Sequence, residues 1–128
     1  MPAPLTLARG QVLRAHFPFS ETSGGKNRRC MVLGWSAATD DPQVLLVPIT
    51  THSGDPSRAT ADDVALDNEP DADVSPGSFL QVTHFAALKI TALVVKESHG
   101  RLRKETVAQA IVALQRMATT TDQLPIRR

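Results

Sequence analysis

The sequence predicts a mainly β protein: a small, curled antiparallel sheet with the strand spacing of a small barrel and one C-terminal helix packed on the sheet. Five or six short apolar segments are separated by stretches rich in Gly, Pro, Ser and Asp, which is typical of strands joined by turns. One longer segment near the C-terminus carries apolar residues at helical spacing. Strands that come first and a helix that follows favour this architecture over repeated βαβ units.

The first two strands are predicted on either side of a flexible loop. Residues 10–17, GQVLRAHF, alternate in the manner of a half-buried strand, and the Pro-, Ser- and Gly-rich segment after them predicts the loop. Residues 29–35, RCMVLGW, form the second strand. Its alternation predicts that Met31, Leu33 and Trp35 share one face and belong to the core.

The third strand is the most hydrophobic stretch of the chain. Residues 43–51, QVLLVPITT, are continuously apolar rather than alternating, which indicates a central strand covered on both faces. Pro48 has no N–H to donate to a neighbouring strand, so we expect a bulge or an edge position there.

The second half of the chain is predicted to hold shorter strands and the helix. Residues 53–76 are acidic and turn-rich, with a short strand only at 64–66. Two further strands are predicted at 77–85 and 91–96, and the helix at 103–118.

The helix is predicted from its apolar face but lacks a capping residue. No Ser, Thr, Asp or Asn stands where the helix should begin, and the tail, residues 119–128, is expected to fray. The residues that repeat on one face are Val107, Ala110, Ile111, Leu114 and Met117.

Length and composition suit a single cytoplasmic domain spanning residues 1–128. The single cysteine, Cys30, excludes an internal disulfide and fits a reducing compartment. The sequence has neither the apolar run of a secretory signal nor the run of about 18 apolar residues needed to span a membrane. We therefore expect no membrane association.

The net charge of +1 hides a strongly uneven distribution. Residues 9–29 hold five cations and one acid, residues 40–73 hold nine acids and one cation, and residues 89–128 hold eight cations and three acids. This pattern predicts a basic surface for an anionic partner beside an acidic loop.

Several common sites are absent from the sequence. GGKN lacks the spacing and the hydroxyl of a phosphate-binding P-loop, and GWSAA lacks the second glycine of a nucleophile elbow. The four histidines, His16, His52, His84 and His99, show no paired ligand spacing. We therefore expect no metal and no cofactor.

The chain resembles the MazF/PemK family of toxin ribonucleases in three segments that occur in the family's order: RGQVLRAHFPFSETSGGKNRRCMVLG, VLLVPITTH and GRLRKETVAQAIVALQRM. That family has a G-[DE]-[IV] strand, a flexible loop, an R-P-x-[LV]-[VIL] strand, a P-[IV]-T strand and a closing G-x-L helix segment. The resemblance implies an SH3-like barrel, a homodimer, metal-free cleavage of single-stranded RNA, and an antitoxin protein that wraps and blocks the toxin.

The resemblance also implies two catalytic residues. Arg29 matches the arginine of the family's R-P pair, with Cys30 in the place of the proline, and Thr50 matches the catalytic threonine of P-[IV]-T. An arginine suits the charge that develops on the phosphate, because its planar fork donates two hydrogen bonds and keeps its charge. The threonine would bind the phosphate or position the 2′-hydroxyl that attacks it.

The sequence departs from PemK-like members at one pair of positions. Those members carry a catalytic R-x-D where this chain has Gln81 and Thr83, neither of which is charged, although MazF-like members often lack the pair as well. We expect Gln81 and Thr83 to contact RNA without transferring protons.

His52 is the candidate for proton transfer, because it follows Thr50 by two residues and so points to the same side of a straight strand. Lys26, Arg28 and His16 are predicted to bind the RNA backbone. Plainer explanations remain open for each residue: a strand-end cation, a β-branched residue that favours strands, or a solvated loop histidine.

His84 alternates with Leu80 and Val82, which predicts a histidine of the core.

The predicted function is a sequence-selective endoribonuclease toxin that needs no metal and is controlled by an antitoxin. The alternative is a degenerate SH3-like barrel that binds nucleic acid or a peptide without catalysis. Arg29 and the PITTH segment favour the enzyme, whereas the uncharged Gln81 and Thr83 favour the alternative.

Overall fold

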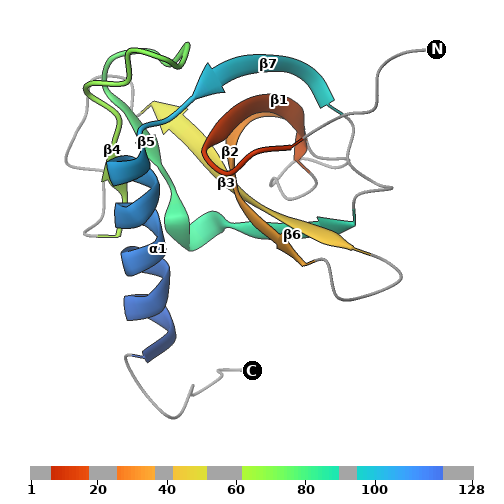
Figure 1. Ribbon diagram of the computed structural model, residues 1–128, viewed down its shortest axis with the longest axis vertical. Coiled ribbons are helices and arrows are strands. Elements are labelled where there is room, and N and C mark those ends of the chain that lie inside the picture. The colour runs from red at the N-terminus through yellow and green to blue at the C-terminus, as the bar shows by residue number, and fades with distance from the viewer. Residues whose placement is uncertain (1–6, 18–25, 37–41, 52–61, 90–94, 120–128) are drawn as a thin grey trace.

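The computed structural model describes residues 7–17, 26–36, 42–51, 62–89 and 95–119, and it confirms a mainly β fold with a C-terminal helix (Figure 1). The strands are β1 (Gln11–Phe17), β2 (Lys26–Ser36), β3 (Gln43–Thr51), β4 (Val64–Ala65), β5 (Ser78–Leu80), β6 (Ala86–Lys89) and β7 (Val95–Arg101). A short 3₁₀ helix, η2 (Val82–His84), lies between β5 and β6, and α1 (Lys104–Thr119) follows β7. No helix in these ranges is long and apolar enough to cross a membrane.

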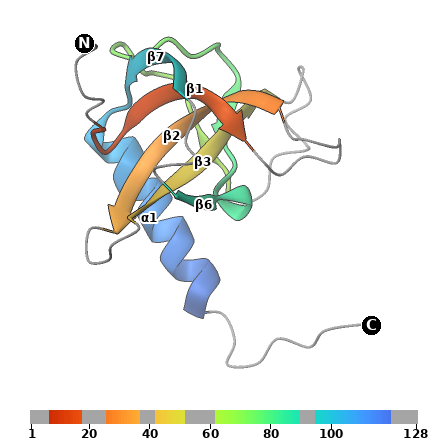
Figure 2. The same ribbon diagram turned by 90° about the vertical axis from the view of Figure 1, so that its right-hand side faces the viewer.

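The strands form one curled antiparallel sheet in the order β4-β5-β3-β2-β1-β7, with β6 also paired to β3. Figure 2 shows β7, β1, β2, β3 and β6 side by side, with α1 behind them. The register shifts once between β2 and β3 and twice between β1 and β7. Such irregularities bend a strand and increase its twist, which lets a short sheet curl.

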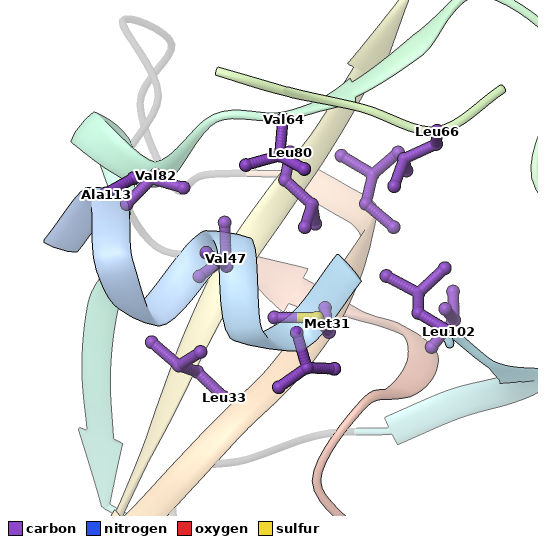
Figure 3. Close-up of a cluster of buried hydrophobic side chains, with 13 residues drawn as sticks. Met31, Leu33, Val47, Val64, Leu66, Leu80, Val82, Leu102 and Ala113 are labelled. Atoms are coloured by element: carbon purple, nitrogen blue, oxygen red, sulfur yellow. The ribbon is translucent and has the colours of Figure 1, made fainter. Parts of the chain in front are cut away.

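The sheet is apolar on both faces, because alternate residues of β1, β2 and β3 enter two different clusters. Figure 3 shows the larger cluster, in which Met31 and Val47 pack beside α1. The buried members of the smaller cluster, on the other face, are Leu13, Ala15, Cys30, Val32, Val44 and Leu46. Each fully buried Leu, Val or Met side chain contributes about 1.5–3 kcal/mol. The prediction that the third strand is covered on both faces is therefore confirmed.

The apolar face predicted for the helix is the face that packs on the sheet. Val107 and Ala110 are buried, and Ile111, Leu114 and Met117 pack against the same cluster. The missing capping residue is replaced from a distance. Glu69, 34 residues earlier, accepts hydrogen bonds from the backbone N–H of Arg103, the side chain of Arg103 and the hydroxyl of Thr106.

Two of the predicted strands are wrong in their limits. The segment predicted as one strand at 77–85 is β5, then the 3₁₀ turn η2, then the separate strand β6. The turn lets Val82 enter the core while the chain changes direction. The strand predicted at 91–96 is described as β7 from Val95 to Arg101, and residues 90–94 lie outside the described ranges. Its polar sequence is compatible with its position at the edge of the sheet.

Two side chains also differ from expectation. Trp35 is 46% exposed, because the register shift between Val32 and Gly34 moves it off the face of Leu33. His84 is exposed rather than in the core, since η2 breaks the alternation on which that prediction rested.

Pro48 does not lie at an edge of the sheet, but one of the two ladders of β3 is interrupted at its position. It lies opposite Cys30, at the point where the other neighbour of β3 changes from β6 to β5.

Candidate active site

The predicted catalytic residues Arg29 and Thr50 lie at the same end of the sheet. The ladder between β2 and β3 ends at the pair Cys30–Pro48. Arg29 is the next residue beyond Cys30, and Thr50 lies two residues beyond Pro48, where β3 pairs with β5 through Phe79. The two residues therefore come together at a strand end, although they are 21 positions apart in the sequence.

The alternation of side chains places Arg29 and Thr50 on opposite faces at this end. Arg29 alternates with Met31, which belongs to the cluster beside α1. Thr50 alternates with Pro48 and Leu46, and Leu46 belongs to the cluster on the other face. A ligand would thus reach both residues only by passing around the end of the sheet.

Arg29 is paired with an acid from the acidic segment. Its Nη2 lies 3.5 Å from Oδ2 of Asp73, and the two side chains are 36% and 73% exposed. A pair this exposed contributes about 0–1 kcal/mol. The guanidinium therefore has a fixed neighbour but stays accessible to a stronger anion such as a phosphate.

His99 lies next to Asp73, between it and Glu97. Nδ1 of His99 lies 3.3 Å from the same Asp73 oxygen, and its Nε2 lies 3.0 Å from Oε2 of Glu97, in an orientation that does not make a hydrogen bond. The side chain of His99 is only 11% exposed.

Arg14 completes the surroundings of Arg29. It pairs directly with Arg29 across to β2 and with Glu97 across to β7, so the three side chains share one face.

The other predicted RNA-binding residues spread around the same end. Arg28 is half-buried and alternates with Cys30, so it lies on the face of Thr50. His16 is half-buried and pairs with Asn27, two residues along β1 from Arg14. Lys26 pairs with Phe17 through its backbone at the start of β2, and its side chain is outside the described part of the chain, as is the whole of His52.

Gln81 and Thr83 flank the turn after β5. The N–H of Gln81 donates to the carbonyl of Pro48 at 2.9 Å, which fixes it two residues from Thr50 along β3. Thr83 is exposed, with its Oγ1 3.0 Å from Nδ1 of His84. Gln81 is therefore beside Thr50, and Thr83 is on the outer surface of η2.

The sequence profile of the PemK-like, MazF-like toxins of type II toxin–antitoxin systems matches residues 8–118. The chain belongs to this family. Its members are endoribonucleases, so at this general level the chain is a toxin endoribonuclease. A comparison with curated protein sequences finds no match.

The fold of this PemK-like, MazF-like toxin is also found among solved structures. The Mycobacterium tuberculosis toxin MazF-mt6 superposes with a TM-score of 0.57 and 15% sequence identity, over 88% of this chain and 99% of the other. At that identity the likeness concerns the fold, and it confirms the predicted curled sheet with its C-terminal helix.

Cys30, in the place of the family's proline, is buried and unreactive. Burial raises the pKa of its thiol to about 12, an effect that the nearby charge of Arg28 partly opposes. The thiol is therefore protonated at neutral pH and is a poor nucleophile. Its role is to pack between β1 and β3.

Across the described ranges, no group of three or more His, Cys, Asp or Glu side chains is arranged to hold a metal ion. The charged groups around Arg29 instead combine two arginines with two carboxylates and one histidine.

Asp73, Glu97 and His99 were not identified from the sequence. Asp73 is one of nine acids in the charged stretch 40–73, and nothing local distinguishes it from the others. Glu97 and His99 are two residues apart, which would have placed them on one face if residues 97–101 had been recognised as strand. Recognising KESHGR as a strand would have revealed the shared face. The segment lacks the apolar residues from which the other strands were predicted.

Proposed function

We propose that this family member is a metal-independent, sequence-selective endoribonuclease that cleaves single-stranded RNA and is inhibited by an antitoxin. The observation that carries the proposal is the position of Arg29, a partly exposed arginine in a weak ion pair with Asp73, at the strand end that also bears Thr50. Family membership supports the general activity.

The proposed chemistry uses the substrate's own 2′-hydroxyl as the nucleophile. Its oxygen attacks the adjacent phosphorus, and negative charge grows on the phosphate oxygens. Arg29 stabilises that charge with two parallel N–H donors, which is the geometry that guanidinium offers to phosphate. Thr50 hydrogen-bonds the phosphate or positions the 2′-hydroxyl from the opposite face.

The remaining residues bind and orient the RNA. Lys26, Arg28 and His16 attract the backbone, a term that strengthens at low salt. Gln81 and Thr83 are uncharged donors and acceptors suited to base edges. His52 stays the candidate for proton transfer near Thr50.

We also propose that the toxin acts as a homodimer in the cytoplasm. One small sheet offers little surface for several nucleotides, and a second copy would lengthen the binding surface. Sedimentation at tens of micromolar should give a dimer, whereas a monomer at that concentration would contradict this part of the proposal.

The test of the activity is cleavage in the absence of metal. Purified protein should cut single-stranded RNA in EDTA and leave a cyclic phosphate. A matched RNA with a 2′-deoxynucleotide on the 5′ side of the cut should resist, because the nucleophile is gone. Cleavage of the deoxy substrate would contradict the internal attack, and binding of RNA without any cleavage would favour the degenerate barrel.

A further inference from the structure

The acidic segment from Glu69 to Asp73 is fastened to the edge strand β7 by its backbone. The N–H of Arg101 donates to the carbonyl of Asp71 at 2.9 Å, and the N–H of Asp73 donates to the carbonyl of His99 at 2.7 Å. Between these bonds, Ala72 bridges to Gly100. The position of Asp73 is therefore set by the backbone and does not depend on its weak ion pair.

Gly100 makes this attachment possible. Its φ of +92° is disfavoured for residues with a side chain, and a Cβ built on it would collide with the backbone of Asp71 and Ala72. The close approach of the two backbones thus requires glycine at this position. The fold therefore fixes the position of Asp73 through a backbone contact that only glycine allows.

The carboxylate of Asp73 contacts two side chains and is nevertheless mostly exposed to solvent. One oxygen, Oδ2, contacts both Arg29 and His99, and the side chain is 73% exposed. When a phosphate takes over Arg29, the backbone contacts with β7 still keep Asp73 in place. Asp73 then lies next to the bound phosphate with an oxygen accessible to the ribose.

The proposed reaction also requires a base on the face of the sheet that carries Arg29. Thr50 lies on the opposite face, and the R-x-D acid of PemK-like members is replaced by Thr83. Of the carboxylates described near Arg29, Glu97 lies opposite Arg14, and Asp73 is the one in contact with Arg29 itself. We therefore propose that Asp73 is the carboxylate that accepts the proton of the attacking 2′-hydroxyl, a role that rests on the proposed ribonuclease activity.

The proton balance of this step is simple. As the 2′-oxygen bonds to phosphorus, its proton passes to the Asp73 carboxylate. The bond between phosphorus and the 5′-oxygen breaks, and the electron pair leaves with that oxygen, which takes a proton from water. The hydroxide so formed removes the proton from Asp73 and restores the carboxylate, while Arg29 stabilises the phosphate throughout.

The test compares Asp73→Asn with Asp67→Asn, which removes the same charge from an exposed position of the same acidic stretch. Asp73→Asn should lower the cleavage rate at saturating RNA by about 10²-fold or more. Its affinity for the uncleavable 2′-deoxy RNA should be unchanged or higher, since one negative charge near the phosphate is gone. Asp67→Asn should change neither quantity, and Asp73→Glu should recover part of the rate.

The opposite result has a clear meaning. If Asp73→Asn cleaves as fast as the wild type or faster, Asp73 only competes with phosphate for Arg29, and the inference is wrong while the ribonuclease activity stands. If the wild type itself does not cleave RNA, the proposed function fails and this role fails with it.

Discussion

Glu69 and Asp73 are four residues apart in one acidic segment, and each pairs with an arginine, yet their surroundings are opposite. The side chain of Glu69 is 0% exposed and accepts three hydrogen bonds at the start of α1. The side chain of Asp73 is 73% exposed, and its Oδ2 lies 3.5 Å from Arg29 and 3.3 Å from His99. A carboxylate–arginine pair therefore serves two purposes within one segment.

The difference shows how burial and donor number separate a structural ion pair from an available one. Removing the charge of a buried carboxylate leaves its donors unsatisfied, which is costly, whereas an exposed pair exchanges with water at little cost. Arg103 is thus committed to holding the helix, and Arg29 is free to change partners. Substitutions in both pairs test this contrast, and a third prediction concerns a buried acid without an ion pair.

The largest expected effect is on catalysis at the exposed pair. Arg29→Ala should lower the cleavage rate at saturating RNA by about 10²–10³-fold, with little change in affinity, because a donor to the transition-state charge is lost. Arg103→Ala is the matched control and should leave the rate unchanged. The measurement is single-turnover cleavage of RNA. Equal losses for both arginines would remove the proposed distinction between them.

The next effect is on stability at the buried pair. Glu69→Gln should lower the free energy of unfolding by about 2–3 kcal/mol, because an amide has one acceptor oxygen in place of two and loses the charge that strengthens these bonds.

The control for this change is Asp73→Asn, which should shift the free energy of unfolding by less than about 0.5 kcal/mol, as is usual for exposed positions. Urea unfolding followed by circular dichroism measures both variants. A loss at Asp73 as large as that at Glu69 would show that the segment is held as one unit by its side chains.

The smallest effect concerns Cys30, a weak acid whose burial outweighs the nearby charge of Arg28. Its pKa is raised from 9.0 to about 12 in the folded state. Above pH 9 the unfolded thiol loses its proton while the folded one keeps it, so the unfolded state binds fewer protons and stability falls as the pH rises. At pH 10 the loss should be about 1.4 kcal/mol.

Cys30→Ala provides the comparison for this pH effect. The variant should be less stable at pH 7 because of lost packing, but its stability should fall less between pH 8 and pH 10. The chain contains no tyrosine, which removes one common source of titration in this range. Parallel slopes for the wild type and the variant would mean that the thiol is not the titrating group.

Local pattern determined the framework of this protein. Each of these elements carries its signal within one segment: β3 is a continuous apolar run, β1 alternates, and α1 has a helical repeat. Strand, helix and core face could therefore be derived from the sequence. The order of the motifs was enough to point to the toxin family and to Arg29 and Thr50. Such signals need no knowledge of what a segment packs against.

The tertiary structure decided the features that depend on two distant segments. Glu69 caps a helix 34 residues away, which no local capping rule can detect. Asp73 reaches Arg29 only because Gly100 admits a second backbone against β7, and the faces of Arg29 and Thr50 follow from register. Long-range backbone contacts set these positions, and a one-residue difference in register reverses the face of a side chain.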